Sequence, residues 1–326
     1  MAWSIVPCTH ESGETVRALM RDDSLAGEYG KLALPGVFED AWSDPFADPA
    51  RRWLAVVDGR AVGFCLALVL PSDSGAWAMI RLGVVKPHRS SGIGTALLET
   101  CLAYLEGPGA GPPIDEYCLA AWLPAGEVAA FAARHAFHHA RYFWKMVRPR
   151  GSPPRADWPA GTEPRVFDGG EAMLRDWNDA YLASFARHFH FVRSSLEQTR
   201  AFTRQRTFRP DGLILAYRDG RCVGFCRNTI REREGEVALL GVVPEARGLG
   251  LGRALLRWSV AWLERMEAEP IVLAVDGENE SALALYRSEG FQVERTREFW
   301  ARSVSSSARP GSRSPLSARS SSSSSP

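Results

Sequence analysis

The chain has 326 residues, of which 45% are hydrophobic, and its formal net charge is +1 at pH 7. This length is sufficient for two domains, each with a core of its own, and the small net charge gives no reason to expect binding to nucleic acid. Six cysteines in a chain of this size do not indicate a disulfide scaffold.

The N-terminus lacks the apolar segment of a signal peptide. The longest apolar run, Ala61–Leu70, is too short to span a bilayer and is predicted to be a strand. Cys222 and Cys226 share one strand face, but no Cys-x-x-Cys or His-x-x-His accompanies them, so no metal site is expected. We therefore expect a cytoplasmic protein without a metal ion, and neither a membrane nor a nucleic acid as its partner.

The sequence repeats itself at an interval of about half its length. Residues 54–65 return at 215–226, in both copies as a strand, an Asp-Gly turn and a second strand. The pattern Arg-x-x-Gly-x-Gly occurs at 89–94 and again at 247–252, each time between an apolar strand and an apolar-periodic helix. A period this long indicates two whole domains and not a solenoid.

The repeat divides the chain into an N-terminal domain at 1–148 and a C-terminal domain at 165–303. Residues 149–164 are rich in Pro and Gly and are predicted to be the linker. Residues 304–326 are mostly Ser with Pro, Gly and Arg, cannot bury apolar surface, and are predicted to be a disordered tail.

The predicted fold class is α+β, with two tandem domains that each have a mixed, largely antiparallel sheet flanked by helices. Ser194 or Ser195 is expected to cap the second helix of the C-terminal half. In chain order, the elements expected in that half are a strand at 165–167, helices at 170–187 and 195–205, strands at 213–217, 221–230 and 236–243, a helix at 250–266, a strand at 271–275, a helix at 280–288 ended by Gly290, and a strand from Phe291. The N-terminal half repeats this order.

A glycine-rich turn between a strand and a helix is suited to phosphate binding. Glycine lets backbone N–H groups approach a pyrophosphate closely, and the helix N-terminus adds a favourable dipole. The chain has no Gly-x-x-x-x-Gly-Lys-Ser/Thr motif, and Gly248-x-Gly250-x-Gly252 does not fit the dinucleotide-binding fingerprint. Two such loops in the same context indicate a duplicated nucleotide-cofactor fold of another type.

Three elements occur in a characteristic order: a strand that ends Leu-Gly-Val-Val before Pro244, the loop at 247–252, and the pattern Asn-x-x-Ala-x-x-x-Tyr-x-x-x-Gly-Phe at 279–291. In this the chain resembles a tandem of the GNAT superfamily, the Gcn5-related N-acetyltransferases, over nearly everything except the linker and the tail. The resemblance implies acetyl-CoA as co-substrate and transfer of its acetyl group to a primary amine of a small molecule or peptide.

In the superfamily, the strand before the loop pairs with the pantetheine arm of acetyl-CoA, the loop holds the pyrophosphate, and the later motif lines the thioester end. The resemblance therefore assigns to the cofactor, in the C-terminal half, Leu240, Val242, Val243, Arg247, Gly248, Leu249, Gly250, Leu251, Gly252, Arg253, Asn279 and Ala282. In the N-terminal half it assigns Leu82, Val84, Val85, Arg89, Ser90, Ser91, Gly92, Ile93, Gly94 and Thr95.

Acetyl transfer to an amine benefits from a base, because an alkyl amine with a pKa near ~10.4 is only about 0.1% neutral at pH 7. The resemblance makes Glu236, on the strand before the loop, the candidate base. It places Tyr286 near the thioester, where a hydrogen bond that strengthens as charge develops on the leaving thiolate is the economical role.

The N-terminal half lacks both candidate catalytic residues. The glycine loops are 158 residues apart (247 minus 89), and this offset places Ala78 at the position of Glu236. Alignment of Ala136-Phe137 with the Gly-Phe pair of the C-terminal motif places Ala132 at Tyr286 and Ala125 at Asn279. We therefore expect a degenerate N-terminal half and chemistry in the C-terminal half.

Several alternatives stay open. The chain could be an acetyl-CoA-binding sensor or regulatory module without transfer, or its first half could act through another base such as Glu127. Within the superfamily, the tandem arrangement is similar to that of the mycothiol synthases, which acetylate the cysteinyl amine of a glucosamine–inositol thiol precursor. His188 and His190 are either pocket lining or part of a surface turn. Strands near the two C-termini could pair the halves with each other, so that a monomer would suffice.

Overall fold

The computed structural model describes residues 2–44, 46–72, 75–107, 111–151 and 155–304. The tail expected at 304–326 lies outside the described residues except for Val304. The elements of the N-terminal half are β1 (Trp3–Pro7), α1 (Ser12–Met20), α2 (Asp23–Tyr29), η1 (Gly30–Ala33), α3 (Val37–Trp42), η2 (Pro49–Arg51), β2 (Arg52–Val57), β3 (Arg60–Pro71), β4 (Ala76–Val84), η3 (Lys86–His88), α4 (Ile93–Glu106), β5 (Ile114–Trp122), α5 (Gly126–Arg134) and β6 (His138–Arg148). Those of the C-terminal half are β7 (Glu163–Val166), α6 (Glu171–Phe185), α7 (Leu196–Phe202), η4 (Pro210–Gly212), β8 (Leu213–Arg218), β9 (Arg221–Arg231), β10 (Glu234–Val242), η5 (Pro244–Ala246), α8 (Leu251–Arg265), β11 (Ile271–Asp276), α9 (Glu280–Ser288) and β12 (Gln292–Ser303).

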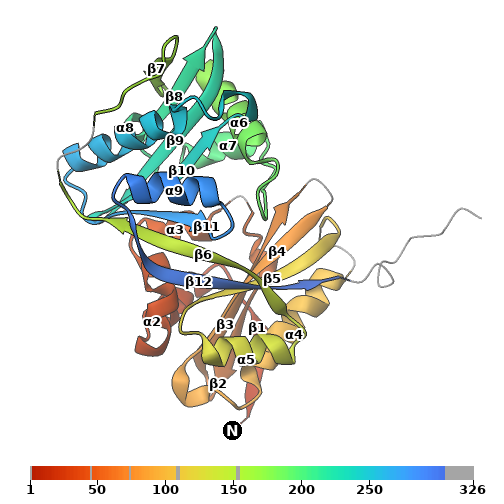
Figure 1. Ribbon diagram of the computed structural model, residues 1–326. Coiled ribbons are helices and arrows are strands. Elements are labelled where there is room, and N and C mark those ends of the chain that lie inside the picture. Colours follow the sequence, from red (N-terminus) through yellow and green to blue (C-terminus); the bar gives the residue numbers. More distant parts are fainter. Residues whose placement is uncertain (1, 45, 73–74, 108–110, 152–154, 305–326) are drawn as a thin grey trace, which may run out of the picture.

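Within the described residues, twelve strands form one sheet with the order β1-β2-β3-β4-β5-β12-β6-β11-β10-β9-β8-β7. This order has an approximate twofold symmetry, because each strand of the first half has its counterpart at the same distance from the opposite edge. β6 and β12 run antiparallel beside each other at the centre. Figure 1 shows them crossing the middle of the molecule, with the N-terminal half below and the C-terminal half above.

The two halves exchange strands at this centre. β6 ends the first half in sequence, but its residues Phe143–Arg148 pair with β11 of the second half. β12 ends the second half, but it pairs with Glu116–Trp122 of β5 in the first half. The expected pairing of the halves through strands near their C-termini is therefore present, and it places those strands in the interior of the sheet instead of at its edges.

Helices cover both faces of the sheet. Successive strand residues point to opposite faces, and each face packs against its own helices. In the N-terminal half Phe64 joins the core under α1 and α2, whereas the next residue, Cys65, joins the core under α4. In the C-terminal half Phe225 packs against Trp177 of α6, whereas Gly224 lies against the leucines of α8. We refer to the two sides of the C-terminal half as the α6 face and the α8 face.

The structure confirms the α+β fold class and the order of elements in the C-terminal half. Ser195 caps α7, since its side chain accepts from the backbone N–H of Gln198 in a capping box. Gly290 follows the end of α9 with a φ of +87°, the left-handed conformation expected of a glycine after a helix C-terminus. These signals were local, and local chemistry was sufficient to place them.

Candidate active site

The parallel strands β10 and β11 are paired only at their N-terminal ends. Gly235–Val237 pair with Ile271–Leu273, whereas Leu239–Val242 pair with β9 and have no pairing to β11. Toward the glycine loop, one edge of β10 therefore faces an opening between the strands. Backbone groups at such an opening can pair with an extended ligand as with an added strand. β4 and β5 part in the same way after Met79 and Cys118.

β10 contains a one-residue bulge at the point where it leaves β11. Val237 pairs with Asn228 and Leu239 with Arg227, so that Ala238 has no cross-strand partner. β4 pairs with β3 without any register shift along its whole length. Because a bulge bends a strand and re-aims its side chains, the opening of the C-terminal half has a different shape from that of the N-terminal half.

The bulge also corrects one sequence-based correspondence. Glu236 lies opposite Thr229, and the residue equivalent to Thr229 in the repeat is Leu68, which lies opposite Met79. The structural counterpart of Glu236 is therefore Met79 and not Ala78, because the constant offset holds only on the loop side of the bulge. The N-terminal half has no carboxylate at this position with either correspondence.

Glu236 lies on the α6 face, where an arginine holds its carboxylate. Its Oε2 accepts a hydrogen bond from Nη1 of Arg231 at 2.5 Å and a long one from Oγ1 of Thr229 at 3.5 Å. The Glu236 side chain is 22% exposed, and its Oε1 has no hydrogen-bond partner in the described part of the chain. One oxygen therefore fixes the carboxylate, and the other can accept a proton.

Tyr286 approaches from the opposite side, on α9. The residue is buried and packs edge-on against Phe291. Burial raises the pKa of the Tyr286 phenol far above its usual value, and the nearby Cys226 acts in the same direction. Across the described residues, the phenol oxygen has no hydrogen-bond partner. Tyr286 thus keeps a neutral O–H group that is free to donate.

The glycine loop has the backbone conformation that its sequence predicts. Gly248 and Gly250 have φ values of +78° and +85°, and Gly250 is the N-cap of α8. No atom lies within 4 Å of a Cβ placed at either residue, so the backbone conformation and not crowding requires glycine here. In the N-terminal half, Gly92 and Ser90 adopt the equivalent conformations, with φ values of +86° and +59°.

Arg247 anchors this loop. Its Nε donates to the carbonyl oxygen of Val242 at 3.1 Å, and its Nη2 donates to the carbonyl oxygen of Ser184 at 2.9 Å. The side chain assigned to phosphate by resemblance therefore ties the loop to the end of β10 and to the last turn of α6. This fixes the loop amides in place before any ligand arrives.

Arg89 anchors the N-terminal loop in the same way, through the carbonyl oxygens of Val84 at 3.0 Å and Ser24 at 2.8 Å. In addition, its Nη1 pairs with Glu127 at 2.7 Å. Arg89 follows β4 and Glu127 follows β5, so this ion pair links the two sides of the opening between those strands. Glu127, the alternative base considered for the first half, is thus engaged with an arginine.

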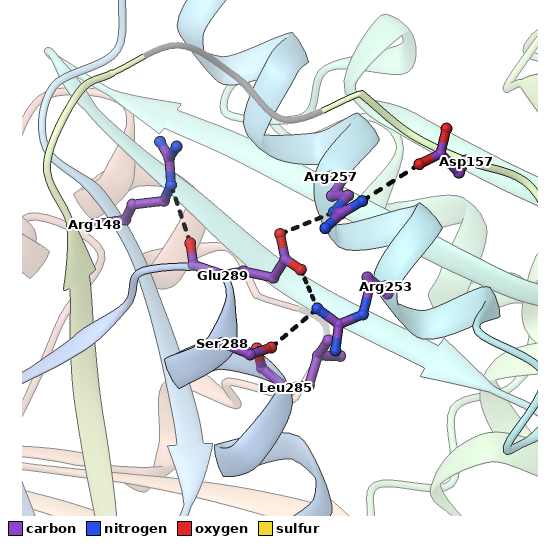
Figure 2. Close-up of polar contacts among 7 residues, drawn as sticks. All are labelled: Arg148, Asp157, Arg253, Arg257, Leu285, Ser288 and Glu289. Carbon is purple, nitrogen blue, oxygen red and sulfur yellow. Dashed lines mark hydrogen bonds and ion pairs between the residues drawn. The ribbon is translucent and has the colours of Figure 1, made fainter.

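Arg253 belongs to an ion-pair network that Figure 2 shows around Glu289. The buried Glu289 carboxylate accepts from Nη1 of Arg253 and, at 2.9 Å, from Nε of Arg257. Arg148, on the exchanged strand β6, donates to the Glu289 carbonyl oxygen at 3.2 Å. Arg253 therefore ties α8 to the end of α9, which fixes the two helices of the α8 face relative to each other.

Asn279 serves as the N-cap of α9. Its Oδ1 accepts from the backbone N–H of Ala282 and from the hydroxyl of Ser281, both at 3.1 Å. The side-chain oxygen of Asn279 is thereby committed to the helix, which explains the asparagine of the motif by helix capping.

The other residues assigned to the cofactor lie on the two strands, the two loops and the first helical turns. At the strand ends, the Val243 N–H donates to Val223 O at 3.0 Å, and the equivalent Val85 N–H donates to Val62 O at 2.9 Å. The carbonyl oxygen of Leu82 accepts from the Tyr29 hydroxyl at 2.9 Å. In the N-terminal loop and helix, Ser91 Oγ donates to His88 O at 2.6 Å, and Thr95 Oγ1 lies 3.1 Å from His135 Nε2. Leu251 and Ile93 are buried, Leu249 is exposed, and Leu240, Gly252 and Gly94 are not fully buried.

His190 lies at the junction of the two halves. Its Nε2 is 2.6 Å from a carboxylate oxygen of Glu116 on β5, and its ring stacks on Trp77 of β4 at 4.1 Å and on Phe189 at 3.8 Å. The side chain is 12% exposed, so the expected alternative of a plain surface turn is wrong for His190. It holds the loop between α6 and α7 against the N-terminal half, whereas His188 contacts its own loop at the Phe189 carbonyl.

Two arginines, Arg227 and Arg231, lie beside Glu236 and carry no motif that marks them in the sequence. Arg227, Thr229 and Arg231 alternate along β9 and share the α6 face, and Glu236 lies opposite the central one. The period-two pattern that places them on one face was visible in the sequence. The burial of the Nε atoms of Arg227 and Arg231 depends on tertiary packing and was not visible there.

Comparison with known proteins identifies the family. The profile of the Acetyltransferase (GNAT) family matches residues 18–118 and 171–291. A mycothiol acetyltransferase of Thermomonospora curvata is 34% identical over 250 residues, which cover 75% of this chain and 80% of that protein. A mycothiol acetyltransferase of Thermobispora bispora is 35% identical over 254 residues, which cover 74% of this chain and 80% of that protein.

Solved structures share the fold. A GCN5-related N-acetyltransferase from Sphaerobacter thermophilus has a TM-score of 0.70 at 22% identity over 95% of this chain and 96% of its own. A tandem GNAT protein from the clavulanic acid biosynthesis pathway has a TM-score of 0.70 at 19% identity, over 95% of this chain and 100% of its own. In the described ranges, no helix combines the length and apolar character needed to cross a membrane. The chain belongs to the GNAT family of acetyltransferases, and it is an acyl-CoA-dependent N-acetyltransferase.

Proposed function

We propose that the C-terminal half transfers the acetyl group of acetyl-CoA to a primary amine, with Glu236 as base and Tyr286 as hydrogen-bond donor to the leaving sulfur. The observation that supports this most directly is the bulge at Ala238, where β10 leaves β11. Glu236 lies two residues before this bulge on the α6 face, and Tyr286 lies on α9, which packs beside α8. The equivalent positions of the N-terminal half hold Met79 and Ala132, and its strand has no bulge.

The cofactor-binding residues fit this proposal through their backbone. Leu239–Val242 offer an unpaired strand edge for the extended pantetheine arm. The turn at Gly248–Gly250 and the N-terminus of α8 offer N–H groups and a positive dipole end for the phosphates. Acetyl-CoA would supply a thioester already activated for attack.

Glu236 and Tyr286 would then act on opposite sides of the reacting carbon. Oε1 of Glu236 accepts the proton of the ammonium group, directly or through one water, so that the neutral amine forms the new C–N bond. As the C–S bond breaks, the Tyr286 hydroxyl donates a hydrogen bond to the sulfur on which negative charge develops. The raised pKa of Tyr286 favours this hydrogen bond over complete proton transfer.

For the acceptor, we propose a cysteinyl amine such as that of a mycothiol precursor. Both relatives described above are mycothiol acetyltransferases that match three quarters of this chain. The N-terminal half would contribute through its contacts with the α6–α7 loop, where His190 meets Glu116 and Trp77. A sensor that binds acetyl-CoA without transfer is the alternative, and turnover separates the two.

The test is N-acetylation followed by mass spectrometry of the product, with a cysteinyl glucosamine–inositol acceptor and the same compound without its cysteinyl group. Glu236→Gln should lower kcat by about 10²- to 10⁴-fold, as expected for loss of a general base, with acetyl-CoA affinity retained. Tyr286→Phe should lower it by roughly 10- to 100-fold, the value of one hydrogen bond to a charged group. Met79→Gln, the matched change in the N-terminal half, should leave kcat unchanged.

Full activity of the Glu236→Gln, Tyr286→Phe double variant would refute the proposed chemistry. Binding of acetyl-CoA without any acetylated amine would favour the sensor. Calorimetric titration with acetyl-CoA would show whether the N-terminal opening, bridged by Arg89 and Glu127, also binds the cofactor.

A further inference from the structure

Arg227 on β9 has a buried guanidinium nitrogen without a partner among the described residues. Its Nε is buried and makes no hydrogen bond, and none of the ion pairs in the described ranges involves its guanidinium. Burial lowers the pKa of Arg227, and the charge of Glu236 opposes that shift. An arginine nevertheless stays charged in a protein, and a buried charge without a partner is unfavourable. The described residues supply no hydrogen-bond acceptor for this buried nitrogen.

The N-terminal half offers an internal comparison, because it also has a buried arginine in the same cross-strand pair. Arg81 lies opposite Leu66, at the position where Leu239 lies opposite Arg227. The carboxylates of Asp44 and Glu28 offset the positive charges of Arg81 and of Arg297, which lies nearby and pairs with Glu28 at 2.5 Å.

Among the described residues, Glu236 is the carboxylate that offsets the charge of Arg227, and Arg231 already binds Glu236 at 2.5 Å. Arg231 also has a buried Nε without a partner. The C-terminal half therefore has two arginines to one carboxylate where the N-terminal half is balanced. The unmatched donors point to an oxygen atom that arrives with a ligand.

The position of Arg227 identifies which ligand this is. Arg227 lies opposite Leu239, next to the bulge at Ala238 and on the α6 face with Glu236. It retains some accessible surface, so a ligand can reach it. Adjacent strands lie about 4.8 Å apart, so a base on β10 and a guanidinium on β9 can contact two groups of one small molecule separated by a few bonds. In an α-amino acyl compound, the carbonyl or carboxylate oxygen lies at that separation from the amine.

We propose that Arg227 donates hydrogen bonds to the sp² oxygen adjacent to the reacting α-amino group, and that this enzyme therefore selects α-amino acyl compounds over simple amines. This inference rests on the proposed function of the C-terminal half. Arg227 is in this view a specificity-determining residue, because it contacts the acceptor beside the reacting nitrogen without taking part in proton transfer.

The experiment compares kcat/KM for three acceptors with the same thiol and amine: cysteamine, which lacks the oxygen, cysteine, which has a carboxylate, and cysteinamide, which has an amide carbonyl. The wild-type enzyme should prefer at least one of the last two over cysteamine by about 10- to 100-fold, the value of a hydrogen bond to a charged group. Preference for cysteine identifies a free carboxylate, and preference for cysteinamide identifies the carbonyl of a larger conjugate.

Arg227→Met should abolish the preference, so that the variant acetylates cysteine and cysteinamide no faster than it acetylates cysteamine. Arg227→Lys, which keeps the charge, should retain part of the preference and tests the inference if the methionine variant does not fold. Arg81→Met, the matched change in the N-terminal half, should keep the wild-type ratio.

Equal wild-type rates with all three acceptors would overturn the inference and leave the proposed function intact. So would an Arg227→Met enzyme that loses activity equally with each acceptor, since that is the effect of a structural residue. Acetylation of none of the three, or of any other amine, would instead refute the proposed function and the inference with it.

Discussion

Cutting the chain between its halves should not separate them, because the connection that holds them together is the strand exchange. A specific protease site inserted after the exposed Gly151 would leave β6 on one fragment and β7 on the other. After cleavage, the fragments remain joined by the β6–β11, β6–β12 and β5–β12 ladders. Two independent domains joined only by a linker would dissociate after this cleavage.

The strength of this junction can be estimated from the structure. Antiparallel ladders of this length form on the order of 20 backbone hydrogen bonds, each worth about 1 kcal/mol net. Association costs roughly 4–15 kcal/mol of lost freedom. Two anchors add to the balance: Met146 of β6 is buried in the C-terminal core, and Trp300 of β12 is buried in the N-terminal core. Each is worth about 1.5–3 kcal/mol.

The sum favours a dissociation constant below about 1 μM, which corresponds to ~8 kcal/mol. Gel filtration of the cleaved protein at micromolar concentration should therefore give one peak at the elution volume of the intact chain, with acetyltransferase activity retained. Residues 155–304 expressed alone should expose the unpaired edge of β11 and aggregate. Two separate peaks after cleavage, or a stable monomer of 155–304, would refute the reasoning.

Three further outcomes are expected. Glu289→Gln keeps the side-chain shape but removes the charge that Arg253 and Arg257 share, and it should lower the free energy of unfolding by about 1–3 kcal/mol in urea denaturation. Gly241→Ala would place a Cβ 2.5 Å from Cε1 of Phe225; this overpacking should destabilise the protein by about 1–3 kcal/mol in the same assay. Burial raises the pKa of Tyr286 in the folded protein above its unfolded value. The stability linked to the neutral phenol is therefore complete below the unfolded pKa, and it is lost as the pH rises above that value and through the folded pKa. The ratio of wild-type to Tyr286→Phe kcat should therefore stay constant between about pH 7 and pH 9, and a ratio that falls with an apparent pKa in this range would contradict the assignment.

The sequence predicted the elements of this fold because their signals are local. Asp-Gly turns, alternating strands, the Ser195 cap and Gly290 each specify backbone geometry within a few residues. The strand exchange leaves no such local signal. The alternation of His138–Arg148 assigns its side chains to faces of a sheet, but it is the same whether the strand pairs with its own half or with the other.

For the candidate site, too, the backbone conformation was predictable from the sequence, whereas the contacts of the side chains were not. The left-handed turns at Gly248 and Gly250 follow from their glycines, but the roles of the charged and polar residues around them do not. Arg247 and Asn279 fit a ligand-binding pattern by residue type, yet the structure uses them to anchor a loop and to cap a helix. The bulge at Ala238 shifts the register of β10 by one residue. Alignment of the two halves at a constant interval of residues cannot locate such a shift.

The strand exchange also explains why a half without Glu236 or Tyr286 equivalents remains part of the enzyme. In the proposed site, β11 forms one wall of the opening, and its other neighbour is β6, which the N-terminal half supplies. The loop between α6 and α7 is held by Glu116 and Trp77 of the same half. Under the proposed function, the N-terminal half is therefore required even without chemistry of its own, because the position of one strand and one loop of the C-terminal half depends on it.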